Sequence, residues 1–293
     1  MKKILILIAI SAAFMACTKE SNPDISIDGQ MAFTMSVGSK TKATATEFEV
    51  GDKVGLFVVE YNDQTPSPLQ ISGNWVNNVS ATYDGAEWNP SKKIFWPEEK
   101  ADVYGYYPYM SVESVDAQTF AVSLNQNTIR DGETLGGYEA SDFLWAKASG
   151  VSQDQEVVEL NYKHIMSKVV VKLVRGDDFE GDFPETGELY IHNLTTEADI
   201  DLSSGTVVKS STAKTATIKA RTVNAETFEA IVVPQRIETR RPLFEYVANG
   251  ISYLLEDVFY FRNGKQHILE LMINTSPEQI EVEIGCEISE EWK

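Results

Sequence analysis

The sequence predicts an all-β protein built from two antiparallel β-sandwiches in tandem, preceded by a removable N-terminal segment. Runs of Val, Ile, Tyr, Phe and Trp of strand length recur along the chain, and Gly, Asn, Asp or Pro separates them. No stretch keeps a helical period for about 12 residues or more. Because a chain of 293 residues is long enough for two such sandwiches, we place their boundary near residue 165.

Residues 1–16 have the composition of a bacterial export signal. Lys2 and Lys3 precede an apolar run that is too short to span a bilayer, which takes about 20 residues. The run ends in Ala16-Cys17, which resembles a lipobox, the cleavage site of bacterial lipoproteins. Acylation of Cys17, with chains such as palmitate, would tether the mature protein to the outer membrane. The alternative is an ordinary signal peptide followed by an incidental cysteine.

The segment after Cys17 is polar, apart from a plausible strand at residues 31–35. We therefore expect four parts, listed in chain order: a signal peptide (1–16), a lipidated N-terminus holding a first strand or a stalk (17–45), an N-terminal β-sandwich (46–165) and a C-terminal β-sandwich (166–293).

In the N-terminal sandwich, residues 54–59 form a predicted strand, and Asp84-Gly85 marks a predicted hairpin. An aromatic run further along allows two interpretations. Its tyrosines either pack in the core beside a turn, or form a surface on which sugars stack. The tyrosines concerned are Tyr106, Tyr107 and Tyr109.

In the C-terminal sandwich, residues 169–174 form the strongest predicted strand. Asn249-Gly250 and Asn263-Gly264 each lie between two apolar runs. A type I′ turn needs positive φ at both central positions, which Asn and Gly tolerate. Both pairs therefore predict hairpins.

Residues 279–289 alternate between an apolar face and a largely acidic face, which is typical of a half-buried strand. It is either the last strand of the C-terminal sandwich or a donor strand that completes another subunit's sheet. Its apolar side chain Cys286 is expected to pack in a core, with no second cysteine available for a disulfide if Cys17 is acylated. The apolar face consists of Ile280, Val282, Ile284, Cys286 and Ile288.

Composition and motifs argue against several functions. The formal net charge of −19 is unsuited to binding nucleic acid. His164, His192 and His267 stand alone, without the spacing of metal ligands. The sequence has no nucleophile elbow, phosphate-binding loop or dinucleotide fingerprint. We therefore expect neither an enzyme nor a bound metal or cofactor.

Several motifs together resemble the fimbrillin-like family of Bacteroidota lipoproteins, which includes subunits and anchors of type V pili. They are the Gly-Asp strand at 49–57, the Trp, Trp-Pro and Tyr-Tyr-Pro-Tyr series at 88–109, the segments 142–146, 160–169, 228–235 and 263–265, and the terminal Ile288 and Trp292, in the family's order. The resemblance covers nearly the whole chain after Cys17. It implies two transthyretin-like β-sandwich domains, lipoprotein export to the cell surface and a structural or adhesive role in fimbriae.

The resemblance also implies partners: other fimbrial subunits or further copies of this chain, and a host or bacterial surface receptor. In shaft subunits of the family, a protease cuts after an Arg near the N-terminus, and removal of the first strand opens a groove for a donor strand. Here the first arginine after Cys17 is Arg130, and Lys40 and Lys42 are among the earlier basic residues. This favours an anchor, a tip or a free-standing protein, unless a different protease acts. The alternative function is a surface glycan-binding lipoprotein that does not polymerise.

Overall fold

The computed structural model describes residues 29–38, 48–98, 100–274 and 288–292. Their regular structure is almost entirely β, interrupted by two short 3-10 turns, Glu139–Ser141 and Gln153–Gln155. The predicted all-β class is therefore confirmed. No helix in these segments is long and apolar enough to cross a membrane.

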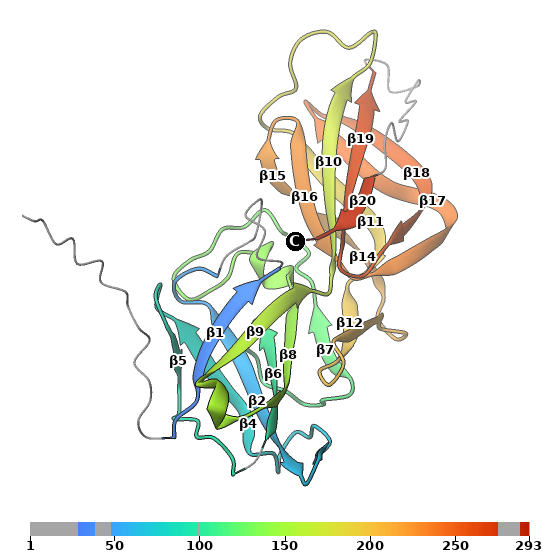
Figure 1. Ribbon diagram of the computed structural model, residues 1–293. Helices are drawn as coiled ribbons and strands as arrows, with labels where there is room; N and C mark the ends of the chain where they lie inside the picture. Colours follow the sequence, from blue (N-terminus) through green and yellow to red (C-terminus); the bar gives the residue numbers. More distant parts are fainter. Residues whose placement is uncertain (1–28, 39–47, 99, 275–287, 293) are drawn as a thin grey trace, which may run out of the picture.

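The first half of the chain forms an eight-stranded sheet in the order β1-β9-β8-β6-β2-β4-β5, with β3 paired to β2 beside this path. It makes the lower body in Figure 1. On β2, Leu56 and Val58 are buried in one apolar cluster, whereas Phe57 and Val59 are buried in another. The centre of the sheet is thus covered on both faces. Its strands are β1 (Ala32–Val37), β2 (Lys53–Asn62), β3 (Thr65–Pro66), β4 (Val76–Tyr83), β5 (Trp88–Pro90), β6 (Ala101–Tyr107), β8 (Leu144–Val151) and β9 (Val157–His164).

This sheet curls until its two ends meet. The residues just before β1 pair with the residues that follow β5. The N–H of Met31 donates to the carbonyl of Ile94 (2.8 Å), and the N–H of Trp96 donates to the carbonyl of Gly29 (2.9 Å). These bonds pair the residues that precede β1, whereas β1 itself has β9 as its ladder partner and remains an edge strand.

The second half is a sandwich of two sheets, drawn as the upper body in Figure 1. One sheet has the order β15-β16-β10-β19-β20 and the other the order β14-β11-β17-β18. Phe228 of the first meets Tyr246 of the second, with ring centroids 5.9 Å apart. The strands are β10 (Ser167–Arg175), β11 (Glu188–Thr195), β14 (Thr215–Lys219), β15 (Arg221–Asn224), β16 (Thr227–Val232), β17 (Gln235–Ala248), β18 (Ile251–Phe261), β19 (Lys265–Ile273) and β20 (Ile288–Glu291).

A small third sheet joins the halves. Its order is β13-β12-β7, where β7 (Gln118–Ala121) comes from the first half and β12 (Glu197–Asp201) and β13 (Thr206–Lys209) come from the second. Phe120 of β7 pairs with Ala198 of β12, and both belong to one core cluster that continues into the second half. The boundary proposed near residue 165 falls between β9 and β10, yet the two units share this core.

Two strand pairs are parallel, whereas the sequence pattern predicts antiparallel sandwiches. β1 runs parallel to β9, with Ala32 opposite Val157. β10 runs parallel to β19, with Val169 opposite His267. Both pairs join strands that are far apart along the chain, so no local turn signal could reveal their direction.

The turn predictions had different outcomes. Asp84-Gly85 connects the paired strands β4 and β5, and Asn249-Gly250 connects the paired strands β17 and β18, so both hairpins are confirmed. The hairpin predicted at Asn263-Gly264 is wrong. Gly264 has positive φ (63°), but β18 and β19 then enter different sheets. β19 finds its partners in β10 and β20 instead.

Candidate functional site

The first described strand, β1, lies at one end of the eight-stranded sheet with β9 as its ladder partner. Phe33 and Met35 pack against the first-half core, and Val37 is buried in it. Thr34, on the opposite face of the strand, is exposed. The Tyr162 hydroxyl on β9 also lies 3.6 Å from the sulfur of Met35. β1 is therefore an edge strand whose apolar face closes a core.

The C-terminal strand β20 lies at one edge of the sheet β15-β16-β10-β19-β20. It pairs antiparallel with β19, with Ile288 opposite Ile268 and Glu291 opposite Lys265. Of the donor-strand candidates, only Ile288 belongs to this described strand. The other candidates lie outside the described residues, as does the proposed lipid-attachment residue Cys17: Ile280, Val282, Ile284 and Cys286.

The residue after β20 folds back onto the first half of the chain. The ring of Trp292 stacks on the ring of His164, with centroids 3.8 Å apart and planes inclined by 9°. The backbone N–H of Trp292 donates to the carbonyl of Gly264 (3.1 Å). His164 is fixed in turn by Asp142, whose carboxylate lies 2.9 Å from Nδ1. The C-terminal residues thus contact both halves.

The proposed aromatic surface is contradicted for two of its three tyrosines. Tyr106 and Tyr107 are only 2% and 6% exposed, whereas Tyr109 is 41% exposed. β6 lies between β2 and β8 and is covered on both faces of the sheet. The side chains that point to either face are therefore all buried. Burial raises the pKa of both buried phenols well above the usual tyrosine value. These rings are core residues, so the glycan-binding alternative loses its proposed platform.

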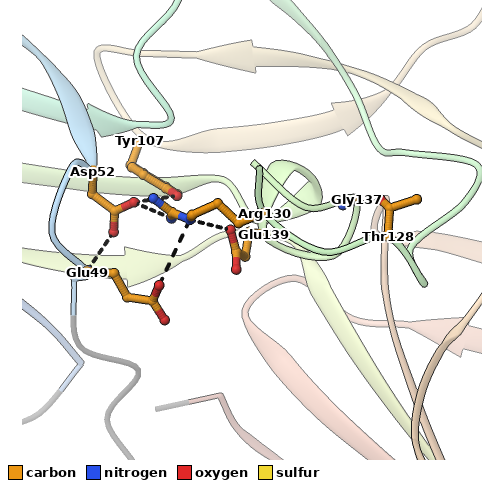
Figure 2. A network of polar contacts seen from close by, with 7 residues as sticks. All are labelled: Glu49, Asp52, Tyr107, Thr128, Arg130, Gly137 and Glu139. Atoms are coloured by element: carbon orange, nitrogen blue, oxygen red, sulfur yellow. Dashed lines mark hydrogen bonds and ion pairs between the residues drawn. The ribbon is translucent and has the colours of Figure 1, made fainter. Parts of the chain in front are cut away.

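Arg130 lies at the centre of a partly buried polar network (Figure 2). Its Nη2 atom is 2.6 Å from Oδ1 of Asp52, and its Nε atom is 2.9 Å from Oε2 of Glu139. The hydroxyl of Tyr107 donates to Asp52 (3.2 Å), and the backbone N–H of Glu49 donates to the same carboxylate (2.8 Å). Burial opposes the charge of Arg130, but hydrogen bonds and the charges of Asp52 and Glu139 raise its pKa.

This network gives Arg130 a structural role. It fastens the long connection between β7 and β8 to the turn before β2. A protease needs an extended, accessible segment, whereas the Arg130 side chain is held at several points. In the sequence, Arg130 is distinguished only as the first arginine after Cys17. The Asp52 carboxylate that pairs with it lies 78 residues away, and no local pattern could connect them.

The three histidines have separate, structural environments. His192 contacts Thr217 Oγ1 through Nδ1 (2.9 Å) and Glu245 through Nε2 (2.8 Å). His267 is buried, and its Nε2 atom accepts from the N–H of Arg262 (3.0 Å). Within the part of the chain that the structure describes, no group of His, Cys, Asp and Glu side chains is arranged to hold a metal ion.

A family model described as fimbrillin-like matches residues 41–292. The chain belongs to the fimbrillin-like family. The resemblance inferred from the ordered motifs is therefore confirmed. No curated protein sequence matches this fimbrillin-like protein.

Crystal structures from Bacteroides have the same fold as this fimbrillin-like protein. A candidate cell adhesion protein from Bacteroides uniformis aligns with a TM-score of 0.65 at 18% identity, covering 91% of this chain and 99% of that one. A second, from Bacteroides ovatus, aligns with a TM-score of 0.64 at 16% identity, covering 90% and 96%. A fimbrial protein from Bacteroides vulgatus gives 0.50 at 12% identity, covering 90% and 99%.

Proposed function

We propose that this fimbrillin-like protein is a structural or adhesive component of a cell-surface fimbria and has no catalytic role. The observation that carries the proposal is β1, an edge strand that closes a core through one apolar face. Such a strand can be exchanged for a strand of another subunit, because the new strand would restore both the backbone ladder and the apolar contacts.

Assembly by donor-strand exchange is part of this proposal. Without β1, the edge of β9 would expose backbone groups, and the first-half core would lose Phe33, Met35 and Val37. Residues 279–289 alternate in the way that the vacated site requires, with one apolar face. The partner would be another fimbrial subunit or a second copy of this chain.

We further propose that Cys17 carries lipid and holds the protein at the outer membrane, facing the cell exterior. The partly buried ion pairs of Arg130 support this, because they disfavour activation by cleavage after that residue. A chain that is not cut keeps its tether and acts as an anchor, a tip or a free-standing surface protein. Cleavage at an earlier lysine by another protease would instead release a pilin.

The test compares three forms of the protein expressed in a Bacteroides host. The forms are the full chain, a Cys17→Ser variant, and a variant lacking residues 18–38. We expect loss of lipid and surface retention in Cys17→Ser, measured by mass spectrometry of the mature N-terminus and by surface proteolysis. We expect the variant without residues 18–38 to capture a synthetic peptide of residues 279–289, whereas the full chain does not.

Two results would contradict the proposal. Wild-type protein without lipid at Cys17 would contradict the proposed membrane tether. If the variant without residues 18–38 folds but binds neither the peptide nor another subunit, assembly by donor-strand exchange is contradicted. A peptide with Glu at the apolar positions 282 and 284 serves as the matched control, since charged side chains are disfavoured in an apolar groove.

A further inference from the structure

A cleft of about 610 Å³ opens where the two halves of the chain meet. Its walls come from β8, the end of β9, the β12–β13 turn, the β18–β19 turn and the C-terminal residues. Clefts of this size at the junction of two structural units commonly bind small ligands. Its aromatic and polar lining includes Trp145, Asn161, Lys163, His164, Asn263 and Trp292.

Trp145 provides one rigid aromatic wall. Its Nε1 atom donates to the carbonyl of Leu202 (2.7 Å), so the indole is fixed to the second half of the chain. Gly205 lies against the ring, and a Cβ atom there would come within 2.5 Å of Cδ2. The indole N–H is already engaged, which leaves mainly carbon surface for a ligand.

Trp292 provides the second aromatic wall. One ring face is covered by His164, and the backbone is held by Gly264. The residue is only partly buried and lines the cleft. Aromatic rings fixed in this way bind ligands at a low cost in conformational entropy, because little freedom remains to be lost.

Polar groups with unused hydrogen-bonding capacity accompany these rings. His164 is not one of the groups open to a ligand, because its side chain is 1% exposed and its Nε2 atom is buried; its ring supports the ring of Trp292. The side-chain amides of Asn161 and Asn263 bring both donors and acceptors to the same cleft, and Lys163 brings an ammonium donor.

This combination requires a ligand that donates to one group and accepts from others while resting on aromatic carbon. Hydroxyl groups both donate and accept, and the C–H faces of sugar rings are apolar. A purely apolar ligand would leave the amide and ammonium groups unpaired, at a cost in free energy. We propose that this cleft is a binding site for a short saccharide. The proposal concerns a different site from β1 and does not depend on fimbrial assembly.

The binding experiment uses the folded protein from residue 18 onward and four probes: lactose, N-acetyllactosamine, 3′-sialyllactose and chitotriose. Saturation-transfer difference NMR and tryptophan fluorescence are measured at millimolar probe concentrations, so that binding as weak as a Kd of about 1 mM is detected. We expect at least one probe to show transfer to its sugar-ring protons and to change the tryptophan emission.

Variants then locate the site. Asn263→Ala, in an exposed turn, is expected to raise the Kd about three- to tenfold, because it removes a hydrogen-bonding group. Trp292→Ala is expected to raise it about tenfold by removing an aromatic wall. Trp75→Ala is the matched control, because Trp75 is 45% exposed and does not line the cleft.

Three outcomes decide the proposal. Binding weakened by these factors in Asn263→Ala and Trp292→Ala but unchanged in Trp75→Ala supports it. Absence of saturation transfer to all four probes overturns it. Binding that survives both cleft variants also overturns it, because the saccharide then lies elsewhere. If Trp292→Ala unfolds, Asn263→Ala and Lys163→Ala still test the site through groups at its surface.

Discussion

The guanidinium of Arg130 lies 2.6 Å from the carboxylate of Asp52, although the two residues are 78 positions apart in the chain. Asp52 is 5% exposed, so its charge is compensated inside the protein and not by solvent. Removing only one member of a buried ion pair leaves the other charge uncompensated.

We therefore expect Arg130→Met to lower the free energy of unfolding by about 2–4 kcal/mol, measured by urea denaturation at neutral pH. Lys53→Ala is the matched control, because Lys53 and Glu133 form an exposed pair at 2.9 Å, and exposed pairs contribute little. Equal effects of the two substitutions would show that the Arg130 network does not stabilise the fold.

Glu229 is expected to make stability depend on pH. Burial opposes its charge, but Lys168 and Arg221 outweigh burial and lower the pKa of the carboxyl below its ordinary value of 4.5. The unfolded chain then binds the proton more tightly, so the stabilisation is present above pH 4.5 and is lost as the pH falls through the folded-state pKa.

Glu229→Gln should therefore reduce stability at neutral pH and make the decline below pH 4.5 shallower, measured by thermal unfolding across an acidic series. Glu238→Gln, at an exposed position on β17, should leave the profile close to that of the wild type. An unchanged acid profile in Glu229→Gln would contradict the assigned role.

Gly105 allows β6 and β9 to pack closely. A Cβ atom at this position would lie 2.3 Å from the hydroxyl of Tyr162 and 2.8 Å from its Cζ atom. Gly105→Ala should therefore lower the free energy of unfolding by about 1–3 kcal/mol through overpacking. Adding Tyr162→Phe removes the nearest atom and should recover part of the loss, which a double-mutant cycle measures. Strict additivity would contradict the proposed contact.

Trp292 is expected to hold β20 in place. Trp292→Ala removes the stacked contact with His164, so the backbone amides of β20 should exchange with deuterium about tenfold faster or more, the equivalent of an aromatic contact. Exchange in β2 should stay unchanged, because β2 is central in the other half. Unchanged protection of β20 would mean that its pairing with β19 suffices.

Local patterns predicted much of this fold, and contacts between distant segments account for the rest. Asn249-Gly250 and Asp84-Gly85 marked real hairpins because a turn depends mainly on adjacent residues. Asn263-Gly264 also turns the chain. However, the strand that follows it, β19, pairs with β10, which lies about one hundred residues earlier in the sequence.

The candidate site shows the same limit. Tyr106 and Tyr107 belong to a strand that packs on both faces, and aromatic content alone does not separate a buried strand from a binding surface. The ring pair of His164 and Trp292 depends on how the C-terminal residues fold back. Residues this far apart carry no shared signal in a single sequence.

The parallel pairing of β1 with β9 has a mechanical consequence. Six residue pairs, from Ala32 and Val157 to Val37 and Tyr162, keep one register along the whole strand. A pull on the N-terminal end of β1 acts along the strand axis. It therefore loads the backbone hydrogen bonds between β1 and β9 in shear, all at the same time. A peeling force applied across the sheet would instead break them one after another. The direction of load therefore decides how firmly the first strand is held.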